Sequence, residues 1–363
     1  MRNSFYTIGA TVFLGLLLLT TPLQGQTPIL VTDALGRELA FEQEPERIVV
    51  AGPATLMIAD ALYLFDSGPR RLVGVTRIDQ GKGNFLRAID PEYGKKTILQ
   101  RQVGPEQIAA LRPDVVFLKT QVRPRLGVRL EAIGIRVVYF DFESPGQYQR
   151  DIAIMARILG ERRRGEEIIQ FFDRKRGEIL RVTSSMTMNA RPSVLFVYVD
   201  GRNESQAFNV PPEDWIQSTL VRDAGGIPVW TAIPLSGGWT TVNLEQIARW
   251  DPGIIFLVAY RQNLSGIQKR LAENAVWQSL TAVGLGNAYS VPVDFYSWDQ
   301  PDVRWILGLQ WMASVLQPEG FPLSGLRESI YEFYRFLYGM NEEQTNQIIF
   351  SILEGDSLPE PGN

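Results

Sequence analysis

The chain has 363 residues, 45% of them apolar, and contains neither cysteine nor histidine. These absences exclude disulfide bonds, thiol catalysis and thiolate metal sites, and they remove the side chain that most often binds transition metals or acts as a general base. The formal net charge of −4 does not favour nucleic acid as a partner, and the length suffices for two cores of ordinary domain size.

Residues 1–25 have the pattern of a secretory signal peptide: the basic residue Arg2, the apolar run 8–19 and the small residue Gly25 at the expected cleavage position. The run is too short and too interrupted for a membrane anchor, which needs about 20 continuous apolar residues. Because there is no cysteine to carry a lipid, we expect a protein that is free in the periplasm. Loss of Arg2 leaves 35 basic and 40 acidic side chains, a charge of 35 − 40 = −5.

The first half of the chain alternates between two patterns. Short apolar runs are typical of strands buried in a parallel sheet, and amphipathic stretches are typical of helices. After a predicted hairpin at 31–37, this alternation predicts a doubly wound lobe over residues 29–160. The predicted strands are 47–51, 72–76, 115–118 and 137–140, and the predicted helices are 56–65, 106–111, 125–133 and 145–159.

A long charged helix is predicted over residues 161–187, directly after Gly160 interrupts the helical pattern. It is long enough to connect two lobes as a strut, and the alternative is that it packs on one lobe alone. The second lobe is predicted over 188–340, with strands 193–199 and 288–291 and helices 215–224 and 303–316, and residues 341–363 form a short helix and a tail.

A repeat supports two related lobes. The segment 106–118 returns without a gap as 245–257, with seven identities in thirteen positions, including Glu106 and Glu245. Each copy predicts a short helix, a proline turn and a buried strand. We therefore expect an α/β protein of two doubly wound lobes, joined by a single long helix, with a ligand cleft between them.

Seven segments in a fixed order resemble the periplasmic substrate-binding proteins of ABC importers for iron-siderophore, haem and cobalamin complexes. The resemblance implies two α/β lobes joined by one helix, a metal chelate bound between them with little hinge motion, and a monomer that reaches the membrane only through a permease dimer. The segments are 32–37 with 45–50, 103–116, 224–226, 242–246, and 277–283 leading into 289–292.

The resemblance also gives the repeated glutamates a role. In the family, one exposed acidic residue on each lobe docks into arginine pockets of the permease, and the matching positions are Glu106 and Glu245. Bidentate bonds to guanidinium groups suit this role. The alternative is that each glutamate stabilises only the amino end of its own helix. Pro105, before the first glutamate, departs from the family pattern.

Ligand candidates lie in the loops after the strands, because ligands of open α/β sheets bind beyond the carboxyl ends. Arginine binds anionic oxygens, and tryptophan and tyrosine rings pack against flat or apolar groups. For each arginine alone, an ordinary surface charge is the alternative, and Trp298 with Asp299 could instead form the capped entrance to the last helix. The candidates are Arg77, Lys82, Arg123, Arg202, Trp239, Tyr260, Arg261 and Trp298.

The expected function is therefore capture of a metal chelate for an ABC importer, with a ferric siderophore favoured by the arginines and no resident cofactor. The ligand would be an iron chelate or a corrinoid. Cobalamin or haem is the alternative favoured by the tryptophans, although the absence of histidine argues against imidazole ligation of haem. A ligand-presenting sensor is a further alternative.

An enzyme is not expected. The sequence has no phosphate loop and no nucleophile elbow. No dense Asp/Glu cluster predicts a site for a bare metal ion.

Overall fold

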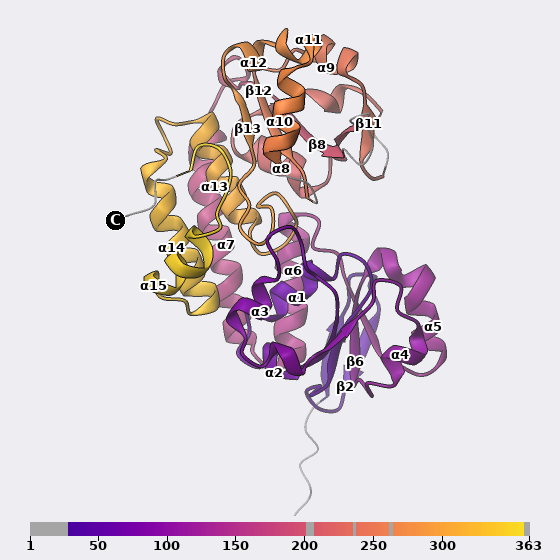
Figure 1. The fold of residues 1–363 in the computed structure, drawn as a ribbon. Coiled ribbons are helices and arrows are strands. Elements are labelled where there is room, and N and C mark those ends of the chain that lie inside the picture. The colour runs from indigo at the N-terminus through magenta and orange to yellow at the C-terminus, as the bar shows by residue number, and fades with distance from the viewer. Residues whose placement is uncertain (1–27, 201–206, 235–236, 261–263, 359–363) are drawn as a thin grey trace, which may run out of the picture.

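The computed structural model describes residues 28–200, 207–234, 237–260 and 264–358. Two α/β lobes are joined along one side by helices (Figure 1). The expected fold class is confirmed. The predicted signal peptide lies outside the described residues. Within them, no helix combines the length and the apolar character needed to cross a membrane.

The first lobe is built on a five-stranded parallel sheet in the order β5-β4-β3-β6-β7. Alternate residues of each strand point to opposite faces, so the apolar runs fill two cores. Val50 and Phe117 face the helices at residues 55–62 and 145–159, whereas Val49 and Val116 face the helices at residues 105–109 and 128–132. The strands are β3 (Ile48–Val50), β4 (Leu72–Thr76), β5 (Thr97–Leu99), β6 (Val115–Lys119) and β7 (Val137–Phe140).

Helices cover both faces of this sheet, and a small antiparallel hairpin precedes it. A π-helical turn at Arg123–Gly127 precedes α5 where one continuous helix was predicted. The hairpin is β1 (Ile29–Thr32) with β2 (Glu38–Phe41), and the helices are α1 (Thr55–Leu62), α2 (Gly68–Arg71), α3 (Phe85–Ile89), α4 (Pro105–Ala109), α5 (Val128–Ala132) and α6 (Pro145–Leu159).

The second lobe has a mixed sheet rather than the parallel one expected from a doubly wound pattern. Its order is β11-β9-β8-β12-β13, with β10 also paired to β8, and β9 is antiparallel to both of its neighbours. Strands β9 and β11 were not predicted, because they are short and flank loops. The strands are β8 (Ser193–Asp200), β9 (Ala207–Val210), β10 (Ile227–Pro228), β11 (Thr240–Val242), β12 (Ile254–Val258) and β13 (Ala288–Ser290).

The sequence repeat is a structural repeat. Strands β6 and β12 occupy the same place in their sheets, each between the first and the last parallel strand of its lobe. The preceding helices end alike, because Arg112 (φ 48°) and Asp251 (φ 38°) both adopt the left-handed conformation immediately before a proline. The helices of this lobe are α8 (Ile216–Asp223), α9 (Leu244–Trp250), α10 (Leu264–Ala272), α11 (Ala275–Gln278) and α12 (Thr281–Gly284).

The predicted strut is helix α7 (Arg162–Thr183), which runs beside both lobes (Figure 1). Gly165 lets α7 approach α6 closely, since a Cβ there would lie 2.3 Å from the Cβ of Ala156. The rings of Phe171 and Phe336 stack at 4.8 Å, and those of Phe172 and Trp305 at 5.3 Å. The C-terminal helices α13 (Trp305–Leu316) and α14 (Ser324–Tyr338) therefore lie along the strut, and α15 (Glu342–Thr345) follows them.

A buried charge cluster joins the two lobes. Arg304, fully buried, donates from Nη1 to Asp60 Oδ2 of α1 at 2.6 Å and from Nε to Asp294 Oδ1 at 2.8 Å. The Tyr338 hydroxyl of α14 donates to the other oxygen of Asp60 at 2.7 Å. Burial raises the pKa of Asp60 against the opposing pull of Arg304, and the surrounding carboxylates raise the pKa of Arg304 although burial opposes this.

Replacing Arg304 with methionine should lower the free energy of unfolding by about 3–5 kcal/mol, because Asp60 and Asp294 would remain buried without their cation. The matched control is Arg335→Met on α14, where the arginine and its partner Glu328 are both exposed, so the expected change is about 0–1 kcal/mol. Urea denaturation of both variants measures the difference. Equal effects of the two substitutions would contradict the assignment of Arg304 as the central cation.

Candidate ligand-binding cleft

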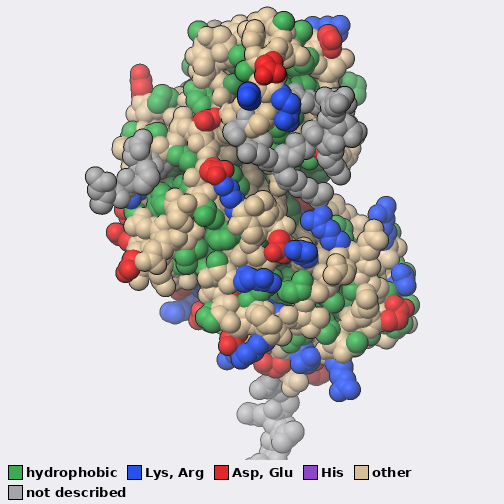
Figure 2. All heavy atoms as spheres, in the orientation of Figure 1, with side chains coloured by type: hydrophobic (Ala, Val, Ile, Leu, Met, Phe, Trp, Pro, Cys, Tyr) green, Lys and Arg blue, Asp and Glu red, His purple; other side chains and the backbone are tan. Residues whose placement is uncertain are grey.

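Two pockets open beyond the carboxyl ends of the first-lobe strands. The larger, of about 630 Å³, is lined by Arg101 and Arg125 together with Gly52. The smaller, of about 210 Å³, shares Gly52 and Arg101 and adds Arg77 and Gln300. Basic side chains gather on the surface of the first lobe that faces the second (Figure 2). We call Arg77, Arg101 and Arg125 the basic wall.

A sharp turn after β3 shapes the floor of both pockets. Gly52 (φ 92°) and Ala54 (φ 58°) are left-handed, and the Gly52 N–H donates to the Thr76 hydroxyl at the end of β4 at 3.1 Å. A Cβ at Gly52 would come within 3.0 Å of Val122 Cγ1. Helix α1 starts at Thr55 without a side-chain cap. Its amino end, where unpaired N–H groups carry partial positive charge, lines the smaller pocket together with Arg77 and Arg101.

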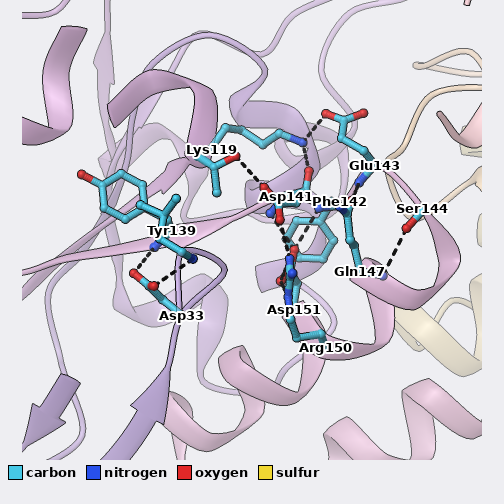
Figure 3. Close-up of polar contacts among 12 residues, drawn as sticks. Asp33, Lys119, Tyr139, Asp141, Phe142, Glu143, Ser144, Gln147, Arg150 and Asp151 are labelled. Atoms are coloured by element: carbon cyan, nitrogen blue, oxygen red, sulfur yellow. Dashed lines mark hydrogen bonds and ion pairs between the residues drawn. The ribbon is translucent and has the colours of Figure 1, made fainter. Parts of the chain in front are cut away.

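A polar network ties the end of β6, which leads into the loop with Arg125, to the turn after β7 (Figure 3). Lys119 Nζ donates to Glu143 Oε1 at 2.6 Å, and the Thr120 hydroxyl donates to Asp141. Arg150 Nη2 of α6 donates to the second oxygen of Asp141 at 2.7 Å. Lys119 is buried in this network rather than directed to a pocket.

Asp151, in the amino-terminal half of α6, belongs to the same network (Figure 3). Asp151 accepts the backbone N–H groups of Asp141 at 2.7 Å and of Phe142 at 2.8 Å. Burial raises the pKa of Asp151, and its bond to Arg150 opposes the rise. The turn after β7 is thereby tied to α6.

Four half-buried rings form the corresponding wall of the second lobe. The ring centroids of Tyr198 and Tyr260 are 4.9 Å apart, those of Tyr198 and Trp239 are 5.4 Å apart, and Trp215 meets Trp239 edge-on at 5.7 Å. Tyr198 lies near the end of β8 and Tyr260 follows β12, at the carboxyl ends of adjacent parallel strands. We call Tyr198, Trp215, Trp239 and Tyr260 the aromatic wall.

Asp299 lies behind the aromatic wall and is fully buried. It accepts hydrogen bonds from the hydroxyl of Tyr260 at 2.6 Å, from Gln217 Nε2 at 3.3 Å and from the hydroxyl of Ser297. Burial raises the pKa of Asp299 and of the Tyr260 hydroxyl. The interpretation of Asp299 as a helix cap was wrong, because α13 begins only at Trp305.

A pair of glutamines forms a contact between the two lobes, beside both walls. Gln80 of the first lobe and Gln300 exchange two amide hydrogen bonds, of 2.9 and 3.0 Å. Gln300 lines the pocket that contains Arg77 and follows Asp299 in the chain. The basic wall and the residues behind the aromatic wall therefore lie beside the same contact between the lobes.

Three predicted ligand residues lie in these walls, namely Arg77, Trp239 and Tyr260. Arg77 is 65% exposed and its nearest acidic partner is Asp79, at 3.3 Å. Trp298 was a wrong candidate, because its ring is fully buried and its Nε1 donates to Asp294 at 3.0 Å. Contact of the three wall residues with a ligand stays a prediction.

Two other candidates are engaged in ion pairs. Lys82 pairs with Glu354 of the C-terminal segment, and Arg123 Nη2 lies 3.5 Å from Glu131. Arg202 and Arg261 lie outside the described residues. Sequence reasoning missed Arg101 because β5, which precedes it, is only three residues long.

The two glutamates of the repeat are exposed in the first turns of α4 and α9. Glu106 is 81% exposed, and the nearest basic group is Arg129 Nη2 at 3.9 Å. In the view of Figure 1, α4 and α9 lie on the side of their lobes opposite to α14. Within the described ranges, no group of three or more acidic residues could hold a metal ion.

Comparisons with known proteins agree with this architecture. A family model described as periplasmic binding protein matches residues 48–294. The molybdate-binding protein MolA of Haemophilus influenzae is 22% identical over 350 residues, covering 87% of this chain and 93% of that protein. The probable siderophore-binding lipoprotein YfiY of Bacillus subtilis is 22% identical over 269 residues, covering 72% of this chain and 79% of that protein.

A solved structure shows the same fold. The crystal structure of a periplasmic solute binding protein from Veillonella parvula has a TM-score of 0.70 and 24% identity, and the match covers 90% of this chain and 98% of that one.

Asp299→Asn should alter how stability depends on pH. Because the folded state raises the pKa of Asp299, it binds this proton more tightly than the unfolded chain does. The resulting stabilisation is fully present below the unfolded pKa, about 3.9, and is lost as the pH rises through the folded value. The variant should therefore gain stability relative to the parent as pH rises from 4 to 8, by about 1.4 kcal/mol per unit of pKa elevation.

Chemical denaturation across this pH range measures the effect, with the exposed Glu328→Gln as the control. A difference between Asp299→Asn and the parent that is independent of pH would contradict the prediction.

Proposed function

The chain belongs to the periplasmic binding protein family, and on that premise we propose that it captures an anionic metal chelate in the cleft and delivers it to the permease dimer of an ABC importer. A ferric siderophore is the first candidate. The observation that supports the proposal is that arginines line the pockets of one lobe, while a cluster of rings lies at the strand ends of the other lobe, beside the Gln80–Gln300 contact.

The chemistry of the walls favours a chelate over a bare ion. Guanidinium groups bind anionic oxygens and repel cations, so the basic wall suits a ligand that carries its metal inside an anionic shell. Ring faces bury flat or apolar surface of such a shell. The name of the Bacillus subtilis relative, a probable siderophore-binding lipoprotein, is consistent with this class.

Two alternatives concern the ligand. Molybdate, named for the Haemophilus influenzae relative, suits the basic wall but leaves the four rings without a role. Cobalamin or haem suits the aromatic wall through its flat macrocycle. A sensor that presents its ligand to a signalling protein would use the same cleft. We propose that this chain acts in the importer as a monomer that is free in the periplasm.

Titration of the purified chain with ferric catecholate, ferric hydroxamate, cobalamin, haem and molybdate tests the proposal. Trp215 and Trp239 lie in the aromatic wall, so ligand entry should quench tryptophan fluorescence. We expect saturable quenching at sub-micromolar concentration, which corresponds to more than about 8 kcal/mol of binding free energy, with a ferric catecholate or hydroxamate. Tight binding of molybdate alone would contradict the proposed ligand class.

Removing one charge from the basic wall should weaken binding of the anionic chelate. We expect Arg101→Gln and Arg125→Gln each to raise Kd about tenfold, since a hydrogen bond to a charged group contributes about 1.5–3 kcal/mol. The control is Arg163→Gln on α7, where the side chain is 92% exposed and remote from the pockets. Equal Kd values for all three variants would show that the basic wall does not bind the ligand.

The repeated glutamates fit the symmetry of the proposed partner. Glu106 and Glu245 lie at corresponding places of two structurally repeated units. Two like subunits of a permease would present two like pockets, so paired carboxylates could each meet a guanidinium group. The repeat therefore supports docking, beyond what each helix terminus needs for its own stability.

Reversing both charges, with Glu106→Arg and Glu245→Arg, should abolish uptake of the radioactive ferric chelate and leave its Kd within about twofold of the parent, because like charges repel across the interface. Uptake in cells that contain the importer and fluorescence titration measure the two properties. The control is Glu328→Arg on α14. Unimpaired uptake by the double variant would contradict the docking role.

A further inference from the structure

Asp299 differs from Asp60 and Asp294, two other buried carboxylates near the lobe junction. Asp60 and Asp294 both pair with Arg304. Among the described residues, no lysine or arginine forms an ion pair with Asp299, and its partners are a phenol, an amide and a hydroxyl. A buried carboxylate without a cation destabilises a fold, so packing alone does not account for an acid here.

The strongest contact of Asp299 is with the aromatic wall. The Tyr260 hydroxyl donates its only proton to Asp299 Oδ2 at 2.6 Å. Gln217, at the start of α8, donates to the same oxygen at 3.3 Å. With its hydroxyl proton committed, Tyr260 offers the cleft a ring surface rather than a hydrogen-bond donor.

The position of that ring decides the shape of the wall. Tyr260 packs against Tyr198 at 4.9 Å and Trp239 at 6.2 Å between ring centroids. Asp299 also precedes Gln300 in the chain. Gln300 exchanges amide hydrogen bonds with Gln80 of the first lobe and lines the pocket that contains Arg77 of the basic wall. Asp299 is therefore one residue away from the junction of the two walls.

We propose that Asp299 is a positioning residue of the cleft, which holds Tyr260 so that the aromatic wall receives a flat ring of the ligand. The inference rests on the function proposed above and specifies it further. The chelate has an arene or another conjugated ring for the aromatic wall and anionic oxygens for the basic wall. Offset or edge-on ring contacts give such a wall its preference for flat groups.

The substitution Asp299→Asn distinguishes a positioning role from a packing role. It keeps the size of the side chain but replaces one acceptor oxygen with a donor NH₂ group, so it cannot accept both the tyrosine and the serine protons as the carboxylate does. Tyr260→Phe removes the hydroxyl and keeps the ring. If Asp299 acts through Tyr260, the two substitutions disturb one interaction and their effects do not add.

The binding test uses the ferric complex of 2,3-dihydroxybenzoate as a ring-bearing anionic probe and molybdate as a ring-free one. For the ferric complex, we expect Asp299→Asn and Tyr260→Phe each to raise Kd about tenfold, and the double variant to match either single one. Any Kd for molybdate should stay unchanged. The control is Tyr289→Phe, a second-lobe tyrosine whose hydroxyl bonds to Asn287 at 3.3 Å, outside the wall.

Three binding results would overturn the inference: an unchanged Kd for the ferric complex in Asp299→Asn, equal losses for both probes, or additive effects in the double variant. Binding of a ring-free solute alone by the parent would also overturn it and leave a solute-binding function in place. Failure of every probe in the titration above would instead contradict the proposed function.

If no probe binds, a measurement without ligand still tests the positioning role of Asp299. Asp299→Asn should reduce the near-ultraviolet circular dichroism of the packed rings while the far-ultraviolet spectrum stays the same. An unchanged near-ultraviolet spectrum would overturn the positioning role.

Discussion

The buried guanidinium of Arg304 is the interaction on which the arrangement of the two lobes depends. It binds Asp60 of the first lobe and Asp294 of the loop after β13, and Tyr338 of α14 bonds to the same Asp60. A charge in this interior is stable only with its partners in place, so separation of the lobes would expose or orphan three charged groups. This constraint, together with the stacked rings along α7, determines how the basic wall faces the aromatic wall.

The lobes share a scaffold but differ in their loops. The helix–turn–strand unit is repeated down to the left-handed residues Arg112 and Asp251, whereas the loops beyond the strands carry arginines in one lobe and rings in the other. Loops tolerate such divergence because they are not part of the packed core. The two walls therefore differ in chemistry. The arginines of the first lobe can neutralise anionic oxygens of a ligand, and the rings of the second lobe can bury its flat surface.

The sequence predicted the scaffold better than the site, for physical reasons. Central strands such as β6 and β12 are buried on both faces and leave long apolar runs, and the repeat predicted their equivalent places. Strands β9 and β11 are only four and three residues long and give no such signal. Trp298 failed as a ligand candidate because a loop can carry a core residue, a distinction that depends on tertiary packing. Arg101 was missed with the strand that positions it.

Hydrogen–deuterium exchange with and without ferric 2,3-dihydroxybenzoate tests most directly whether both walls bind one ligand. We expect slower exchange on ligand addition at residues 52–57 and 99–103 of the first lobe and, in the same experiment, at residues 196–200 and 256–260 of the second. Slower exchange confined to one lobe, or located away from these segments while the ligand is bound, would contradict this expectation.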